Sequence, residues 1–205
     1  MSMICSVLGL SPAQIRALRA TPSLAGDLAS VSQSTLLDET TKRMSPEQKR
    51  AFEMATKGAR ARIREAQVRL ASIGPFEQAL SLEKSWHILH YLFTGHIDGS
   101  SAPGDALLTG EVLGGDVGYG PARLHNETRT REFGNFLETL DLAQLQARVN
   151  VREMARLGVY SVPGGPGDAQ YESELRAEVG HYFPLLRGYV AKMSARKYGL
   201  LIWVS

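Results

Sequence analysis

The sequence predicts an α+β fold, a mostly helical single domain with a small sheet that includes the N- and C-terminal strands. Apolar residues recur at helical spacing through most of the chain, whereas the apolar runs at residues 3–10 and 200–204 are short and typical of buried strands. A length of 205 residues suits one domain with a sizeable core. Apolar residues make up 43% and charged residues 21%, as in ordinary globular proteins.

Two helix starts carry the same local signal. Ser11-Pro12-Ala13-Gln14 and Ser45-Pro46-Glu47-Gln48 each combine a capping box with a proline at the first helical position. The first predicts a helix to about residue 20, and the second predicts a long helix to about residue 72. Between them, residues 24–37 are interpreted as a looser helix.

The long helix has an alanine-rich seam and a basic flank. Its predicted inward residues are Phe52, Ala55, Ala59, Ile63, Ala66 and Leu70. Residues 42–69 contain nine Lys or Arg against three Glu, a local net charge of +6 in a chain whose total is +2. One flank is formed by basic side chains, namely Lys49, Arg50, Lys57, Arg60 and Arg64.

This flank admits two interpretations, a solvated helix face or a surface that meets an acidic protein partner. Nucleic acid is the rival partner, but no aromatic residues alternate with the charges to stack on bases. We therefore expect a protein partner and regard nucleic acid as unlikely.

Residues 81–95 form the densest apolar segment and predict a mostly buried helix. Leu82, Trp86, Leu89 and Phe93 share one face, and Gly95 marks the end. Three histidines lie nearby, His87, His90 and His96, and could suggest a metal site. No carboxylate or cysteine completes a ligand spacing, so a hydrogen-bonded core histidine is favoured and no metal is predicted.

The second half of the chain predicts mainly helices. Residues 96–121 are rich in turns, with a short helix over 106–113 and a mobile glycine loop over 115–120. Residues 122–126 are either a short strand or the approach to a helix over 128–140. Further helices are expected from Asp141, over 151–157, and from Asp168 after a glycine-rich loop at 163–167. Pro184 should kink or split this last helix.

Motifs for catalysis or cofactor binding are missing. The sequence has no G-x-S-x-G elbow, no H-E-x-x-H and no P-loop, and the glycine pattern at 115–120 does not match a dinucleotide fingerprint. The single cysteine, Cys5, excludes an internal disulfide and is expected to be a buried, inert thiol. The N-terminus is a poor signal peptide, and no apolar run is long enough to span a bilayer. We therefore expect a cytoplasmic protein without a cofactor.

Several of these features occur together in the YfbM-like family of small bacterial proteins, which the chain resembles. The matching positions are Met3, Ile4, Trp86, Leu89, His90, Thr94, Gly95, Val112, Leu113, Gly114, residues 137–141 and residues 200–204. The resemblance implies an α+β fold, a bacterial cytoplasmic setting and no established activity, with some members in toxin–immunity neighbourhoods. It covers most of the chain outside residues 40–72, which look like a helical insertion within the domain.

Two functions remain open at this point. The first is an interaction protein without catalytic activity, in the form of an immunity-type inhibitor that binds a toxin or another protein through the basic flank. The second is an enzyme or small-ligand-binding protein with a pocket at Trp86, His90, Thr94 and Glu111, in which His90 supplies acid–base chemistry. Two acidic residues of the following loop, Glu111 and Asp116, are expected to approach His90. A deep pocket lined by His90 would favour the second, and a protruding charged surface would favour the first.

Overall fold

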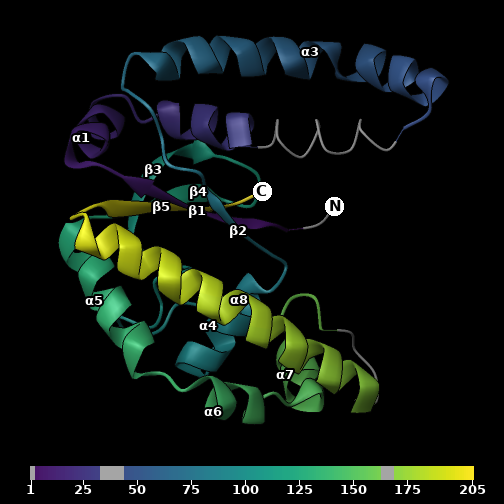
Figure 1. Cartoon of the computed structure of the whole chain (residues 1–205), viewed down its shortest axis with the longest axis vertical. Coiled ribbons are helices and arrows are strands. Elements are labelled where there is room, and N and C mark those ends of the chain that lie inside the picture. Colours follow the sequence, from purple (N-terminus) through teal and green to yellow (C-terminus); the bar gives the residue numbers. More distant parts are fainter. Residues whose placement is uncertain (1–2, 33–43, 163–168) are drawn as a thin grey trace.

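A five-stranded antiparallel sheet forms the middle layer of the fold, in the order β2-β1-β5-β4-β3 (Figure 1). The computed structural model describes residues 3–32, 44–162 and 169–205. The strands are β1 (Cys5–Leu10), β2 (Leu80–Glu83), β3 (Glu111–Asp116), β4 (Pro121–His125) and β5 (Gly199–Val204). β1 and β5 pair from Cys5↔Val204 to Leu10↔Gly199, which confirms that the first and last strands share one sheet.

The central strands bury side chains on both faces, because successive residues of a strand point to opposite sides. Val7 and Ile202 face one hydrophobic core, and Leu8 and Leu201 face the other. The sheet therefore separates two helical layers, each with its own core (Figure 1).

The first layer consists of α1 (Pro12–Ala20), a helical segment at residues 24–32 and α3 (Pro46–Ala71). Both capping boxes are present, so α1 and α3 begin where the sequence predicts. Leu18, Leu28 and Leu70 pack with the sheet in this core. Arg69 at the end of α3 forms an ion pair with Asp27, with Nη2 and Oδ1 2.7 Å apart.

The second layer contains most of the helices. It consists of α4 (Trp86–Thr94), α5 (Glu127–Thr139), α6 (Leu142–Ala147), α7 (Val151–Leu157) and α8 (Ala169–Ala195). α4 is buried along most of its length beneath α8 and contributes Ile88, Leu89 and Leu92 to the core.

Two predicted helical stretches are strands instead. Residues 80–83 form β2, which pairs with β1 at the sheet edge, so the helix after it begins only at Trp86. Residues 111–116 form β3, so the helix predicted over 106–113 is wrong. Gly110 and Gly114 have positive φ values of 133° and 73°, a conformation that a helix does not contain. β4 confirms the strand alternative for residues 122–126.

Of the two alternatives for Pro184, a kink or a split of the last helix, the split is wrong and the kink stays a prediction. α8 runs through Pro184 as a single helix (Figure 1). Val179, Phe183 and Leu186 around it are fully buried, and their packing offsets the roughly 3 kcal/mol that an internal proline costs. The predictions for residues 33–37, 163–167 and Asp168 lie outside the described residues.

Candidate functional site

His90 lies at the centre of the predicted ligand site and is fully buried, with no exposed surface. Its Nε2 lies 2.7 Å from the carbonyl oxygen of Asp98. Trp86 is also buried and donates its indole N–H to the carbonyl oxygen of Met3, at 3.3 Å. The Thr94 hydroxyl donates to the carbonyl oxygen of His90, at 2.9 Å. These three side chains are therefore bonded to backbone carbonyl groups in the interior of the domain and at the end of α4.

Three buried histidines bind the segment between α4 and β3. Nε2 of His87, His90 and His125 lies 2.6, 2.7 and 2.9 Å from the carbonyl oxygens of Ile97, Asp98 and Ala106. Nδ1 of His87 accepts the backbone N–H of Tyr160, so Nε2 of His87 is the donor to Ile97. Burial lowers the pKa of all three histidines, which keeps the rings neutral at physiological pH.

The acidic residues expected beside His90 lie elsewhere. Glu111 forms an ion pair with Arg19 of α1, with Oε2 and Nη2 2.5 Å apart. Asp116 accepts the backbone N–H groups of Gly118 and Gly120 in the β3–β4 turn. The structure thus does not bring Glu111 together with His90, and the ligand-binding role of these residues stays a prediction.

Two carboxylates favour the protonated form of His90, Asp105 with the larger effect and Asp98 with the smaller, and the sequence did not predict a role for Asp105. Asp105 is 5% exposed, and its Oδ1 lies 3.5 Å from Nη2 of Arg129. Its charge favours the protonated forms of both His90 and His125. Asp105 lies in an irregular turn-rich segment, so no periodic pattern could have placed it near either ring.

α3 carries the predicted basic flank. Lys49, Arg50, Lys57 and Arg64 are exposed, whereas Arg60 is half-buried. At 100° per residue, Arg60 lies about 60° around the helix from the buried Ile63, so it borders the packed side. Only Ile63, Ala66 and Leu70 of α3 are buried, and all three lie in its C-terminal half. The N-terminal half therefore presents mostly solvent-exposed side chains.

A pocket of about 530 Å³ lies between the first helical layer and the sheet. β1, β2 and β5 form one wall, and the C-terminal end of α3, residues 28–32 and residues 74–79 form the others. Most of the lining is apolar, and it does not include His90, Trp86, Thr94 or Glu111. The sequence does not predict this pocket, because its walls come from separate segments without a shared motif.

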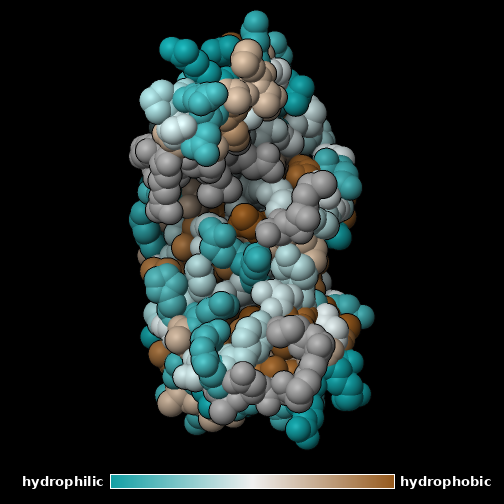
Figure 2. Space-filling model, turned by 90° about the vertical axis from the view of Figure 1, so that its right-hand side faces the viewer, coloured by the Kyte–Doolittle hydropathy of each residue, from teal (hydrophilic) through white to brown (hydrophobic). Residues whose placement is uncertain are grey.

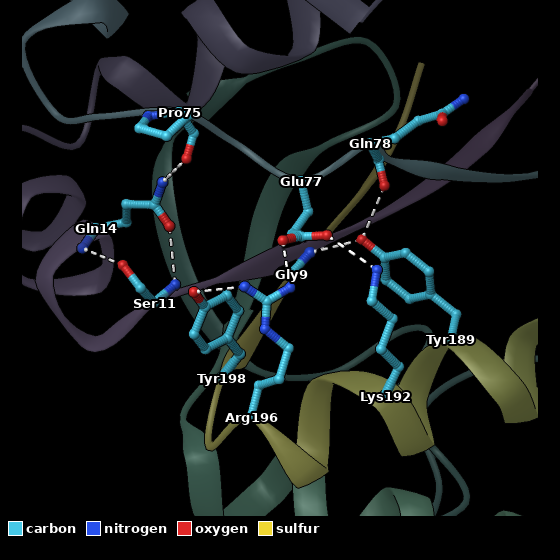
Figure 3. A network of polar contacts seen from close by, with 10 residues as sticks. All are labelled: Gly9, Ser11, Gln14, Pro75, Glu77, Gln78, Tyr189, Lys192, Arg196 and Tyr198. Carbon is cyan, nitrogen blue, oxygen red and sulfur yellow. Dashed lines mark hydrogen bonds and ion pairs between the residues drawn. The ribbon is translucent and has the colours of Figure 1, made fainter.

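A polar network fixes the segment that borders the pocket (Figure 3). Glu77 accepts from Lys192, at 3.1 Å, and from Arg196, and both contacts lower the pKa of its carboxyl group. The Tyr189 hydroxyl donates to the carbonyl oxygen of Gln78 and accepts the N–H of Gly9. Gln14 completes the network, because its side-chain amide donates to the carbonyl oxygen of Pro75. Residues 75–78 are thus tied to α1, β1 and α8.

Two absences hold for the part of the chain that the structure describes. None of its helices is both long and apolar enough to cross a membrane. Within residues 3–32, 44–162 and 169–205, no group of three or more His, Cys, Asp or Glu side chains is arranged to hold a metal ion.

The fold and these sites define an α+β domain whose antiparallel sheet lies between two helical layers. The chain belongs to the family described as "Domain of unknown function (DUF1877)", whose model matches residues 1–203. Its fold is similar to that of YfbM from Escherichia coli, a protein of unknown function, with a TM-score of 0.61 and 16% sequence identity over 99% of this chain and 100% of that one. These findings confirm the YfbM-like assignment. No curated protein sequence matches the chain significantly.

Proposed function

We propose that the protein is a cytoplasmic bacterial interaction protein that binds an acidic surface of a protein partner through the exposed basic face of α3. We define this face as Lys49, Arg50, Lys57 and Arg64. An immunity-type inhibitor that neutralises a toxin by binding it is the specific form of this proposal. Such a role requires a surface and no chemistry of its own.

The observation that carries the proposal is the uneven attachment of α3. Its buried residues, Ile63, Ala66 and Leu70, fix one end of the helix to the domain. The other end carries Lys49, Arg50 and Lys57 of the basic face, and Met54 on the same half of the helix is 75% exposed. Hydrophilic side chains cover much of the end of the molecule that α3 forms (Figure 2). An exposed, charged helix is suited to steering an oppositely charged partner.

The alternative function at His90 has less support. The His90 ring is fully buried and its Nε2 is bound to a backbone carbonyl, so a substrate could reach it only after the core opens. Asp105 beside it is also buried. The environment of His90 is therefore that of a structural histidine, which leaves the basic face as the better-supported site.

The proposal can be tested by reversing charges on α3. Lys57→Glu combined with Arg64→Glu removes two exposed positive charges without touching the buried residues of the helix. Wild-type protein should capture an acidic protein from a lysate of its source organism, and the double variant should lose it. With the purified partner, the association rate should fall at least tenfold at low salt, and this difference should shrink as salt is added.

A matched control reverses two exposed arginines of α7, with Arg152→Glu and Arg156→Glu. This variant has the same net charge as the α3 variant, so it should bind like the wild type if the face, rather than the total charge, matters. Equal association rates for all three proteins would contradict the proposal. Tight binding of generic DNA with a steep salt dependence would instead identify the face as a nucleic-acid surface.

A further inference from the structure

The pocket beneath α3 has a flat floor built by three adjacent strands. Ser6 of β1 lies opposite Ser81 of β2 on one side and opposite Trp203 of β5 on the other. Residues directly opposite each other in an antiparallel sheet point to the same face, so these three side chains form one row across the sheet. All three line the pocket, together with Leu8 of β1.

Trp203 brings a hydrogen-bond donor to this floor. The residue is 2% exposed, and its indole Nε1 is buried without a hydrogen-bond partner. Trp86, the other tryptophan of the chain, does have a partner, the carbonyl oxygen of Met3. Buried N–H groups in folded proteins are nearly always paired. The Trp203 indole is thus an unpartnered donor in the wall of the pocket, which a bound molecule could reach if the ring shifts slightly.

The charge of the lining restricts what could bind. Among the described lining side chains, Glu77 is the one that is charged, and its carboxylate is already held by Lys192 and Arg196. Apart from Trp203, the other polar lining side chains are serines and glutamines. A charged ligand would have no opposite charge to meet here, whereas a neutral one would bury apolar surface against Leu8, Leu28 and Leu70.

The volume of about 530 Å³ falls within the range of small-molecule sites. Hydrophobic atoms are visible at the level of the sheet, below α3, on the face shown in Figure 2. We propose that this pocket binds a neutral, mostly apolar small molecule with one hydrogen-bond acceptor, such as a ketone, ester or amide carbonyl, which accepts the indole N–H of Trp203. This site is separate from the basic face, because the pocket uses the C-terminal end of α3.

The proposal can be tested with prodan, 6-propionyl-2-(dimethylamino)naphthalene, a neutral aromatic ketone whose emission reports both polarity and hydrogen bonding to its carbonyl. Wild-type protein should bind it saturably and shift its emission to shorter wavelength. Trp203→Phe keeps an aromatic ring and removes the donor, so binding should weaken about three- to tenfold and the emission should move further to the blue. Ser6→Phe should fill the floor of the pocket and abolish binding.

Trp86→Phe is the matched control, since it removes the other indole without touching the pocket lining, and it should bind prodan like the wild type. Circular dichroism checks that each variant is folded. A measurement on the wild type does not depend on the variants: of the two indole N–H signals in an NMR spectrum, prodan should shift that of Trp203 and leave that of Trp86 in place. Absence of saturable binding, or an unmoved Trp203 signal, would overturn the proposal.

Discussion

At the scale of single residues, three buried histidines, two on α4 and one on β4, have a structural role. His87, His90 and His125 each bind a backbone carbonyl within residues 97–106, a stretch without regular secondary structure before β3. An irregular stretch needs partners for its carbonyl groups, and the three rings supply them. The sequence predicted that His90 would be a hydrogen-bonded core residue. It could not predict which carbonyls the rings reach, because the path of residues 97–106 follows no periodic pattern.

His90→Ala should destabilise the protein by about 1–3 kcal/mol, because it leaves the carbonyl of Asp98 without its donor and opens a void in the core. Chemical denaturation measures the change in the free energy of unfolding. His96→Ala is the control, since His96 is exposed, and it should change stability by less than about 0.5 kcal/mol. Equal stability of both variants would contradict the structural role of His90.

The same histidines should make stability depend on pH. Burial lowers their pKa in the folded protein, so the unfolded chain takes up protons first as the pH falls. Stability should therefore be complete above the unfolded value of about 6.5, fall as the pH drops through that value, and level off below the folded pKa values. Thermal melts between about pH 7.5 and pH 5.5 should show a falling Tm. His125→Asn should make Tm depend less steeply on pH. A constant Tm across this range would contradict the burial of neutral rings.

At the scale of elements, local signals predicted helix starts and missed edge strands. Ser11 and Ser45 cap their helices through hydrogen bonds within four residues, so the sequence alone determines where α1 and α3 begin. β2 and β3 are the two edge strands, and each depends on pairing with a neighbour that is distant or follows a turn. β3 has one buried residue, Leu113, so its sequence carries no clear alternation.

The close contact between β5 and β4 can be tested at Gly199. A Cβ atom there would lie 2.3 Å from the carbonyl oxygen of His125 and 2.6 Å from Cδ1 of Ile15. Gly199→Ala should therefore push the two strands apart and cost about 1–3 kcal/mol of stability. Gly188→Ala is the control, because a Cβ there meets nothing within 4 Å and alanine suits the middle of α8. This control should be neutral or stabilising, and the same effect from both substitutions would contradict the packing at Gly199.

At the scale of the whole molecule, the two cores share the central strands β1 and β5. Residues of both strands belong to each core, so loss of either strand would expose both. The sequence predicted this pairing because short apolar runs at both ends of the chain need partners for their backbone groups. The pocket could not be predicted in the same way, since its walls come from β1, β2, β5, α3 and two further segments.

Hydrogen–deuterium exchange should reveal an uneven distribution of stability over the molecule. Amides of β1, β5 and the buried part of α8 should exchange last and together, because they open only with global unfolding. Amides in the N-terminal half of α3, over residues 46–62, should exchange much earlier, since none of the side chains there is fully buried. Equal protection of β5 and this half of α3 would contradict the uneven distribution.

The central position of β5 has a consequence for how the chain folds during its synthesis. β5 comes from residues 199–204, so it leaves the ribosome after every other described strand and helix. Until then β1 lacks its longer neighbour and β4 lacks the strand that joins it to β1, so the sheet exists only as separate pieces. We therefore expect the sheet to be completed, and both cores to close, only after residues 199–204 have been synthesised.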